Sequence, residues 1–464
     1  MSANRPINAD VPEPPPPEPA GEEPKGAARG AQGREPERPS PAPSPPKRPR
    51  RRRRQPMPGA LKLVLSLVAV AIVFIVAAIL GGSGGSGEKA SQSAPAPVPQ
   101  PRAETPSGDE TASSQPAEEL GYPAFATNNT TRIGGSDPAA NAAAVALAVF
   151  PGTSASQRPA AVALASEEDW AGAIAAAVLM APPVRAPLLF SAADGLPDAT
   201  TEALAALSPG GDHSTGGAAA FRIGAVAAPD GVKDTAVRAG SAPAEAAAIA
   251  KLRERLVGSP PEHVLIASSE QAGMAMPAAA WAARSGDPVL FAEAKQLPAE
   301  TAAALKRHPK APVYVLGPAS AVSAAVLREI AAIDPRVKRV SGPGPVASAI
   351  AFARFADGSF GWNVNDPGHG FVLARDDSPL SAAAAAPLSA SGTWGPLLLT
   401  DSAGSLPAEL RSYFLDVKPG YTTNPTRAFY NHVWVIGDQE AIDVNQQAEV
   451  NELAELAKIG GGEE

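Results

Sequence analysis

A short apolar run with proline near its start recurs three times along the chain. Each copy follows a first apolar run by about twenty residues, and a third apolar run closes each set. The first runs are AVALAS (161–166), HVLIAS (263–268) and GFVLAR (370–375); the second are APLLFS (186–191), DPVLFA (287–292) and GPLLLT (395–400); the third are AAFRIG (219–224), PVYVLG (312–317) and HVWVIG (432–437). Runs of four to six residues that are apolar throughout are typical of parallel strands covered on both faces.

Alanine-rich segments with helical character separate these runs. Each set also begins with an arginine followed by a Gly and Pro step, at Arg132, Arg238 and Arg339. Proline fits the first turn of a helix, where its missing N–H needs no partner. The pattern predicts an α/β fold made of three tandem parallel-sheet sandwich modules, residues 131–236, 237–335 and 336–460.

The residues before the modules have a different composition. Residues 1–58 hold 17 prolines and the basic block KRPRRRRR (47–54), a composition that predicts disorder. The run LVLSLVAVAIVFIVAAIL at 63–80 would span about 27 Å as a helix, which suits a bilayer, so we expect a transmembrane helix over 60–80. The Gly/Ser-rich and then Pro-rich residues 81–130 are predicted to form a stalk.

The arginines beside this run set the expected orientation. Basic residues next to a span stay cytoplasmic, so we predict a single-pass membrane protein with a cytoplasmic N-terminus and an extracytoplasmic C-terminal region. The same position favours attraction to anionic lipids over binding of nucleic acid. The residues concerned are Arg50, Arg51, Arg52, Arg53 and Arg54.

Charge and cysteine content narrow the picture further. Residues 1–58 carry a formal charge of +5 and Lys62 adds +1. Because the whole chain has a net charge of −8, residues 63–464 carry −14. The chain has no cysteine, so the exported region must be stabilised by its core and not by disulfides.

The triplicated order of these motifs resembles the type-2 cell-wall-binding repeat family of Gram-positive bacteria, over about residues 131–458. The resemblance implies three modules in a pseudo-threefold arrangement that hold envelope proteins on anionic cell-wall polymers, with an Ile-Leu-Leu motif implicated in anchoring. At the position where the family usually has Asp before Ala-Leu, this chain has Gly172, Met274 and Ser381.

Residues matching the anchoring motif are the candidate polymer-binding or inter-module residues. Strands of this kind are expected in the core or between modules before they are expected to contact a ligand. The candidates are Leu188, Leu189, Phe190, Val289, Leu290, Phe291, Leu397, Leu398 and Leu399, together with Trp394, which could stack on a sugar ring. Trp170 could stack in the same way.

Candidate catalytic groups are sparse in the sequence. The five histidines show no metal-ligand spacing, and the acidic run Glu167 to Asp169 is explained by the start of a helix. We therefore expect no enzyme activity, no metal and no cofactor. The leading interpretation is an envelope protein that binds a cell-wall polysaccharide. The alternatives are a protein-protein interaction scaffold of the envelope that has lost polymer binding, with an envelope protein as its partner, and a cell-wall hydrolase.

Overall fold

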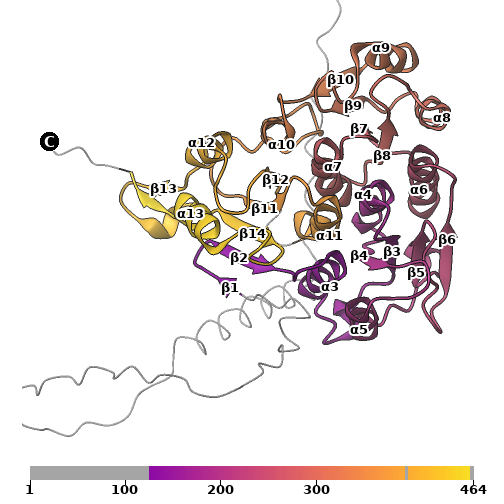
Figure 1. Cartoon of the computed structure of the whole chain (residues 1–464), viewed down its shortest axis with the longest axis horizontal. Coiled ribbons are helices and arrows are strands. Elements are labelled where there is room, and N and C mark those ends of the chain that lie inside the picture. The colour runs from indigo at the N-terminus through magenta and orange to yellow at the C-terminus, as the bar shows by residue number, and fades with distance from the viewer. Residues whose placement is uncertain (1–124, 392–394, 460–464) are drawn as a thin grey trace, which may run out of the picture. The chain divides into compact units, whose positions relative to one another are not determined.

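The computed structural model describes residues 125–391 and 395–459, all within one compact unit (Figure 1). The predicted tail, transmembrane helix, most of the stalk, the arginines at 50–54 and Trp394 lie outside the described residues. Within the described ranges, no helix is long and apolar enough to cross a membrane.

Three parallel sheets form the α/β fold, and all three have the same strand order. The first sheet contains β4 (Leu188–Ser191), β3 (Val162–Ser166), β5 (Ala220–Ile223) and β6 (Asp234–Val237); the second contains β8 (Val289–Ala292), β7 (Val264–Ser268), β9 (Val313–Leu316) and β10 (Val337–Val340); the third contains β12 (Leu397–Thr400), β11 (Gly370–Arg375), β14 (His432–Ile436) and β2 (Thr130–Ile133). The strand β1 (Phe125–Ala126) pairs antiparallel with β2, and β13 (Gly420–Tyr421) pairs with β15 (Ala457–Lys458).

The last strand of each sheet continues directly into a helix that packs on another sheet. The strand β6 leads to a helix over β8, and β10 leads to a helix over β12. The strand β2 completes the third sheet beside β14, although it precedes β14 by some 300 residues, and the helix after it packs on β4 of the first sheet. The three sheets are therefore linked in a closed cycle.

The helices cover both faces of these sheets. They are α3 (Pro138–Val149), α4 (Trp170–Ala176), α5 (Asp198–Leu207), α6 (Ala242–Val257), α7 (Ala272–Ser285), α8 (Ala299–Arg307), α9 (Ala324–Ile333), α10 (Pro345–Arg354), α11 (Pro379–Ala390), α12 (Ala408–Asp416) and α13 (Val444–Ala454). Short 3-10 turns are η1 (Ala155–Gln157), η2 (Ala177–Met180), η3 (His213–Thr215) and η4 (Pro425–Arg427).

Helix starts follow the local rules that the sequence indicates. The proline predicted in the first turn is there in α3, α6 and α10. Carboxylate side chains cap α3 and α4, where Asp137 accepts from Ala140 N at 2.8 Å and Asp169 from Gly172 N at 2.9 Å.

The helices α4, α7 and α11 explain the high alanine content. Each follows the first strand of its sheet, and the three contact one another where the sheets meet (Figure 1). Alanine side chains let helix backbones approach closely, and almost all of those on these helices are buried. The core is therefore continuous across the three sheets.

Two arginines, Arg132 buried and Arg339 half-buried, fix strands at sheet ends. Arg132 on β2 donates to the carbonyls of Gly437 at 2.9 Å and Ile442 at 2.5 Å, and Arg339 on β10 donates to the carbonyls of Gly317 and Val322, each at 2.6 Å. Both arginines thus fix the loop after the neighbouring strand.

The arginine predicted to be equivalent in the first sheet is a different residue. Strand register places Ala236 at this position, and Arg238 lies past the end of β6 and is exposed. Across from Ala236, Arg222 on β5 supplies the guanidinium: it pairs with Asp234 at 2.5 Å and donates to Val226 O at 3.2 Å. The expected equivalence of Arg238 with Arg132 and Arg339 is wrong, because the guanidinium at this place belongs to Arg222 on the neighbouring strand.

Candidate functional site

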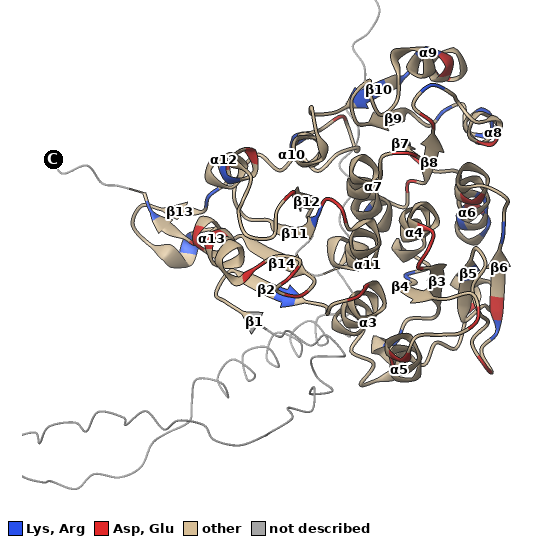
Figure 2. Cartoon of the chain, viewed as in Figure 1, with Lys and Arg blue, Asp and Glu red and all other residues tan. Residues whose placement is uncertain are grey.

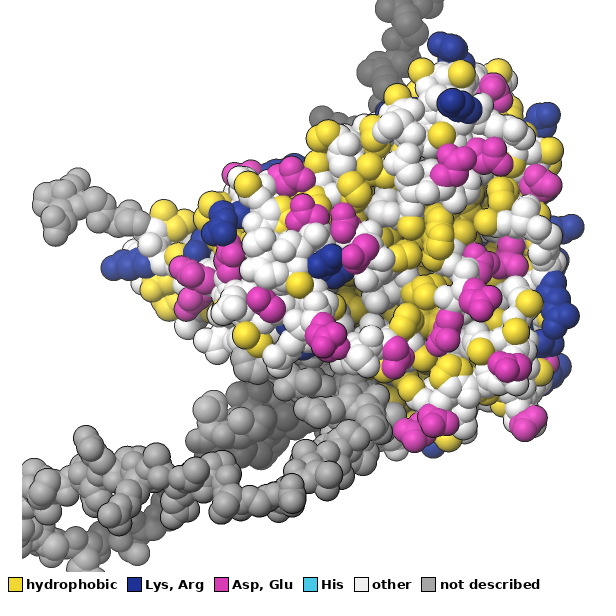
Figure 3. Space-filling model, in the orientation of Figure 1, with side chains coloured by type: hydrophobic (Ala, Val, Ile, Leu, Met, Phe, Trp, Pro, Cys, Tyr) yellow, Lys and Arg dark blue, Asp and Glu magenta, His cyan; other side chains and the backbone are white. Residues whose placement is uncertain are grey.

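Acidic side chains gather where the strands end. Figure 3 shows them around a mainly hydrophobic centre on one face, whereas the blue side chains lie mostly at the edges. Carboxyl ends of parallel strands are where α/β folds usually bind ligands. The acidic residues that follow strands within a few positions are Glu167, Glu168 and Asp169 after β3, Asp194 after β4, Glu270 after β7, Glu293 after β8, Asp376 and Asp377 after β11, Asp401 after β12, and Asp438 after β14.

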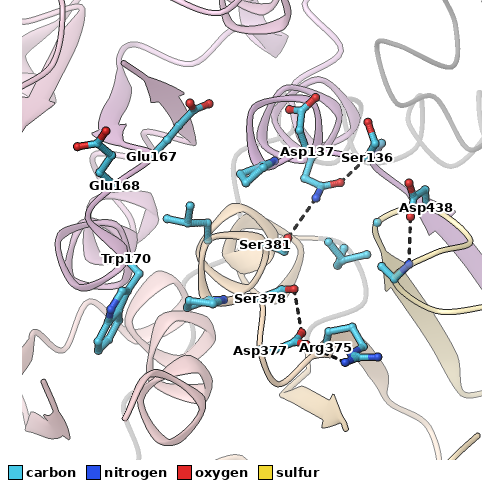
Figure 4. A pocket seen from close by; sticks show the side chains of 18 residues that line it. Ser136, Asp137, Glu167, Glu168, Trp170, Arg375, Asp377, Ser378, Ser381 and Asp438 are labelled. Atoms are coloured by element: carbon cyan, nitrogen blue, oxygen red, sulfur yellow. Dashed lines mark hydrogen bonds and ion pairs between the residues drawn. The ribbon is translucent and has the colours of Figure 1, made fainter. Parts of the chain in front are cut away.

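A cleft of about 330 Å³ opens on this face between the first and third sheets (Figure 4). Its walls are the loop from β2 to α3, the loop from β3 to α4, the start of α11, and the loop after β14. A second hollow borders the same β2 to α3 loop and shares Gly135, Ser136, Asp137 and Asp438 with the cleft. The volume of the cleft is at the lower end of the range, roughly 300–1,000 Å³, that is typical of small-ligand sites.

Asn141 ties the two sides of the cleft together. Its Oδ1 accepts from Gly135 N at 2.9 Å, and its Nδ2 donates to Ser381 Oγ at 3.1 Å. Only 3% of Asn141 is exposed, so both bonds are shielded from water. The loop before α3 is thereby fixed against α11.

The cleft is strongly acidic. Its lining contains Asp137, Glu167, Glu168, Asp377 and Asp438 against a single cation, Arg375. Figure 2 shows the same imbalance along the loops around α3 and α11.

The one cation of the cleft is already partly neutralised. Arg375 Nη2 lies 2.8 Å from Asp377 Oδ2, whereas its buried Nε has no hydrogen-bond partner among the described residues. Burial, followed by the charge of Asp137, raises the pKa of Glu167 above its ordinary value. An anion would meet repulsion here, and a neutral or cationic ligand would not.

Trp170 is the aromatic residue of the cleft lining, which also contains Leu380 and Ile436. The indole is partly exposed and packs edge to face on Phe291 of β8, with ring centroids 5.9 Å apart. It begins α4 immediately after the cap Asp169 and is therefore fixed by both a helix start and a neighbouring sheet. An aromatic ring beside hydrogen-bonding carboxylates is a combination suited to sugar rings.

Two solved structures share this fold. Cwp8 from Clostridium difficile, a cell wall protein, matches with a TM-score of 0.54 and 19% identity over 71% of this chain and 52% of its own. Cwp6 from the same organism, also a cell wall protein, matches with a TM-score of 0.56 and 17% identity over 70% of this chain and 47% of its own. The chain thus spans about half the length of each.

Sequence comparison adds nothing to this likeness. No family model and no curated protein sequence matches the chain. The three-dimensional likeness establishes the fold, and the resemblance to the type-2 repeat family stays a prediction.

The nine candidate residues of the anchoring motif lie in the core. They make up most of β4, β8 and β12, and none is more than 2% exposed. These strands contact helices of the other sheets: β4 contacts α11, β8 contacts α4, and β12 contacts α7. The side chains therefore lack the free surface that contact with a polymer needs, and the strands lie where the sheets meet.

The other candidates are dispersed. Of the acidic run after β3, Asp169 caps a helix as expected, while Glu167 and Glu168 line the cleft. His369, one of the five histidines, lies 3.1 Å from Asp366, which is exposed. Within the described residues no group of three or more His, Cys, Asp or Glu side chains is placed to hold a metal ion.

A pair of carboxyl groups, Glu245 buried and Asp169 half-buried, lies at the corresponding place between the first and second sheets. Glu245 of α6 is 4% exposed, its Oε1 has no hydrogen-bond partner among the described residues, and it faces Asp169. Burial first, and then Asp169, raises the pKa of Glu245 to about 8. A Cβ placed on Gly172 would collide with carboxyl oxygens of both residues, so glycine is what leaves room for the pair.

The sequence carries weak signals for these residues. Gly172 and Ser381 stand out only as departures from the repeat family, and Asn141 and Glu245 are polar residues inside alanine-rich helices. Polar residues at a helix start are ordinary, so their burial becomes visible only once two sheets are placed together.

Proposed function

We propose that this chain is a membrane-anchored, single-pass cell-envelope protein whose three extracytoplasmic modules, arranged around a pseudo-threefold axis, bind a cell-wall glycopolymer without chemical change. The observation that carries the proposal is the fold likeness to two cell wall proteins of Clostridium difficile over about 70% of the chain. The apolar run at 63–80 supports the membrane anchor.

The cleft between the first and third sheets is the proposed binding site. It offers Trp170 for packing against a sugar and the carboxylates Glu168 and Asp377 for hydrogen bonds to hydroxyl or amine groups. Its charge favours neutral or amine-bearing sugars over the anionic polymers that the repeat resemblance implies.

Co-sedimentation with purified cell-wall sacculi tests this function. The full chain in mild detergent is mixed with sacculi before and after acid removal of the attached polymers, at low and high salt. We expect pelleting that is lost when the polymers are removed. Absence of pelleting under every condition contradicts the proposal and leaves the protein scaffold as the remaining interpretation.

A charge-reversal pair tests the site itself. Glu168 is exposed, so Glu168→Lys should leave the fold unchanged and weaken binding about tenfold, which corresponds to about 1.4 kcal/mol. Glu329 on α9 is exposed and far from the cleft lining, so Glu329→Lys is the matched control. Equal weakening by both variants would indicate a general charge effect instead of a binding cleft.

A further inference from the structure

A serine, a histidine and an aspartate form a hydrogen-bonded chain away from the cleft. Ser359 Oγ lies 3.3 Å from His263 Nε2, and His263 Nδ1 lies 3.1 Å from Asp287 Oδ2. This is the connectivity by which a serine nucleophile is activated in hydrolases: one imidazole nitrogen faces the hydroxyl and the other faces a carboxylate. The three residues come from separate loops, so their sequence positions do not reveal the arrangement.

The carboxylate is positioned firmly. Asp287 is 2% exposed, and its Oδ1 accepts from the backbone N–H of His263 at 2.9 Å. Its Oδ2 also accepts from Trp281 Nε1 at 2.9 Å. A buried carboxylate with these bonds holds the imidazole proton on Nδ1 and leaves Nε2 as the acceptor that faces the serine.

The serine is held by a tight hairpin in the segment between α10 and β11. Asp357 and Phe360 exchange two backbone hydrogen bonds, of 2.8 and 3.1 Å, with Gly358 and Ser359 at the turn. Phe360 is fully buried and stacks on Tyr314, with ring centroids 3.5 Å apart. The turn is therefore anchored at its base while Ser359 itself is exposed.

The same turn provides hydrogen-bond donors. Neither Gly358 N–H nor Ser359 N–H donates to another group in the part of the chain that the structure describes. Gly358 has a φ of +64°, which glycine adopts without strain. Free N–H groups beside a nucleophile can stabilise an oxyanion.

We propose that Ser359 and His263 are catalytic residues, with Asp287 as a positioning residue, for hydrolysis of O-acyl esters displayed on a polymer or surface. Ser359 is exposed and lines neither the cleft nor the second hollow. The acyl group would therefore bind at the protein surface and not inside a cavity. This activity is independent of polymer binding in the cleft.

The reaction balances with water as the only co-reactant. Ser359 Oγ bonds to the acyl carbon while its proton passes to His263 Nε2. The ester C–O bond then breaks, and the leaving alcohol takes that proton. Water attacks the acyl-serine, gives a proton to Nε2 and releases the carboxylic acid, and the proton returns to Ser359 Oγ.

A fluorophosphonate probe tests the nucleophile on the full chain. We expect mass spectrometry to find the adduct on Ser359, and Ser359→Ala to abolish both labelling and hydrolysis of p-nitrophenyl acetate above background. Ser320→Ala, a change at another exposed loop serine, should retain both. Labelling of Ser359 no faster than that of Ser320 would overturn the proposal.

A cysteine substitution tests the base without disturbing the core. The natural chain has no cysteine, so Ser359→Cys and Ser320→Cys each introduce a single thiol. We expect iodoacetamide to react about tenfold faster with the thiol at 359, because the imidazole promotes the thiolate. Equal rates would show that His263 only fills space beside the turn, and would overturn the proposal even if sacculus binding succeeds.

Discussion

The junction between the third and first sheets and the junction between the first and second sheets are built alike but carry different chemistry. In each, a strand leads into a helix with a polar residue eight positions after the strand ends: Asn141 after β2 and Glu245 after β6. Asn141 bonds to Ser381 and lies beside an open cleft. Glu245 instead faces Asp169 across the gap left by Gly172.

The difference shows how repeated backbones acquire separate roles. At the junction of the third and first sheets, Asn141 and Ser381 are short and neutral, so they bond to each other and leave space in front of the helix starts. At the junction of the first and second sheets, the buried carboxyl group of Glu245 occupies that space and carries a proton. The side chains at two positions therefore decide which junction can receive a ligand.

Arg132 should give the largest effect of any single change at these junctions. Arg132→Ala removes a buried guanidinium and leaves the carbonyls of Gly437, Asp438 and Ile442 without their donor, and should cost about 3 to 5 kcal/mol in the free energy of unfolding. Urea denaturation measures this change in the free energy of unfolding. Arg339→Ala removes two such bonds and should cost less; a larger loss there would contradict the assigned role of β2 in closing the cycle.

Glu245→Gln should alter how stability depends on pH. The folded protein raises the pKa of Glu245 from its ordinary 4.5 to about 8, so it binds the proton more tightly than the unfolded chain does. Protonation of Glu245 therefore contributes to the free energy of unfolding of the wild type in full below about pH 4.5, and this contribution is lost as the pH rises through about 8. The variant should match the wild type at pH 4.5 and be the more stable of the two at pH 9.

Thermal unfolding across this pH range measures the effect. Glu329→Gln, an exposed change, serves as its control. Parallel curves for the wild type and Glu245→Gln would show that Glu245 is ionised and solvated in the folded protein.

Asn141→Ala should lower the free energy of unfolding by less than Arg132→Ala does. It removes the acceptor of Gly135 N and the donor to Ser381, at a cost of about 1 to 2 kcal/mol. Because the loop before α3 is then free to move, sacculus binding should weaken as well. Ser348, at the same position of α10, bonds to Gly342 and provides a matched alanine substitution that should leave binding unchanged.

Glu168→Gln should have the smallest effect on stability. The side chain is exposed, so the free energy of unfolding should change by less than about 0.5 kcal/mol. Sacculus binding should still weaken, because a carboxylate of the cleft becomes a neutral amide. A loss of stability comparable to that of Asn141→Ala would show that Glu168 holds the loop and does not face a ligand.

The apolar runs were sufficient to predict the inner strands of each sheet. β3, β7 and β11 begin and end within a residue of the predicted runs, because uninterrupted burial leaves a strong local pattern. The prolines of the second runs precede their strands and still contribute carbonyls to the ladder, as Pro187 does to Ala163 N at 2.9 Å.

The outer strands were not predictable in the same way. TTRI in β2 and VKRV in β10 are short, and at least half of the residues in each are polar. The parallel partner of β2 is β14, some 300 residues later, and the partner of β10 is β9 of the preceding predicted module. The cleft was likewise hidden, because Asn141 and Ser381 are 240 residues apart and meet only through the arrangement of the sheets.

The position of β2 has a mechanical consequence. The chain enters the described fold through β1 and β2, and β2 is held to β14 by parallel pairing and to the loop beyond it by Arg132. Tension applied along the chain from its N-terminal side would load the bonds between β2 and β14 together in shear, and would not peel them one at a time. Because β1 is an edge strand that pairs with β2, the strand that closes the cycle is the first to carry such a force into the rest of the fold.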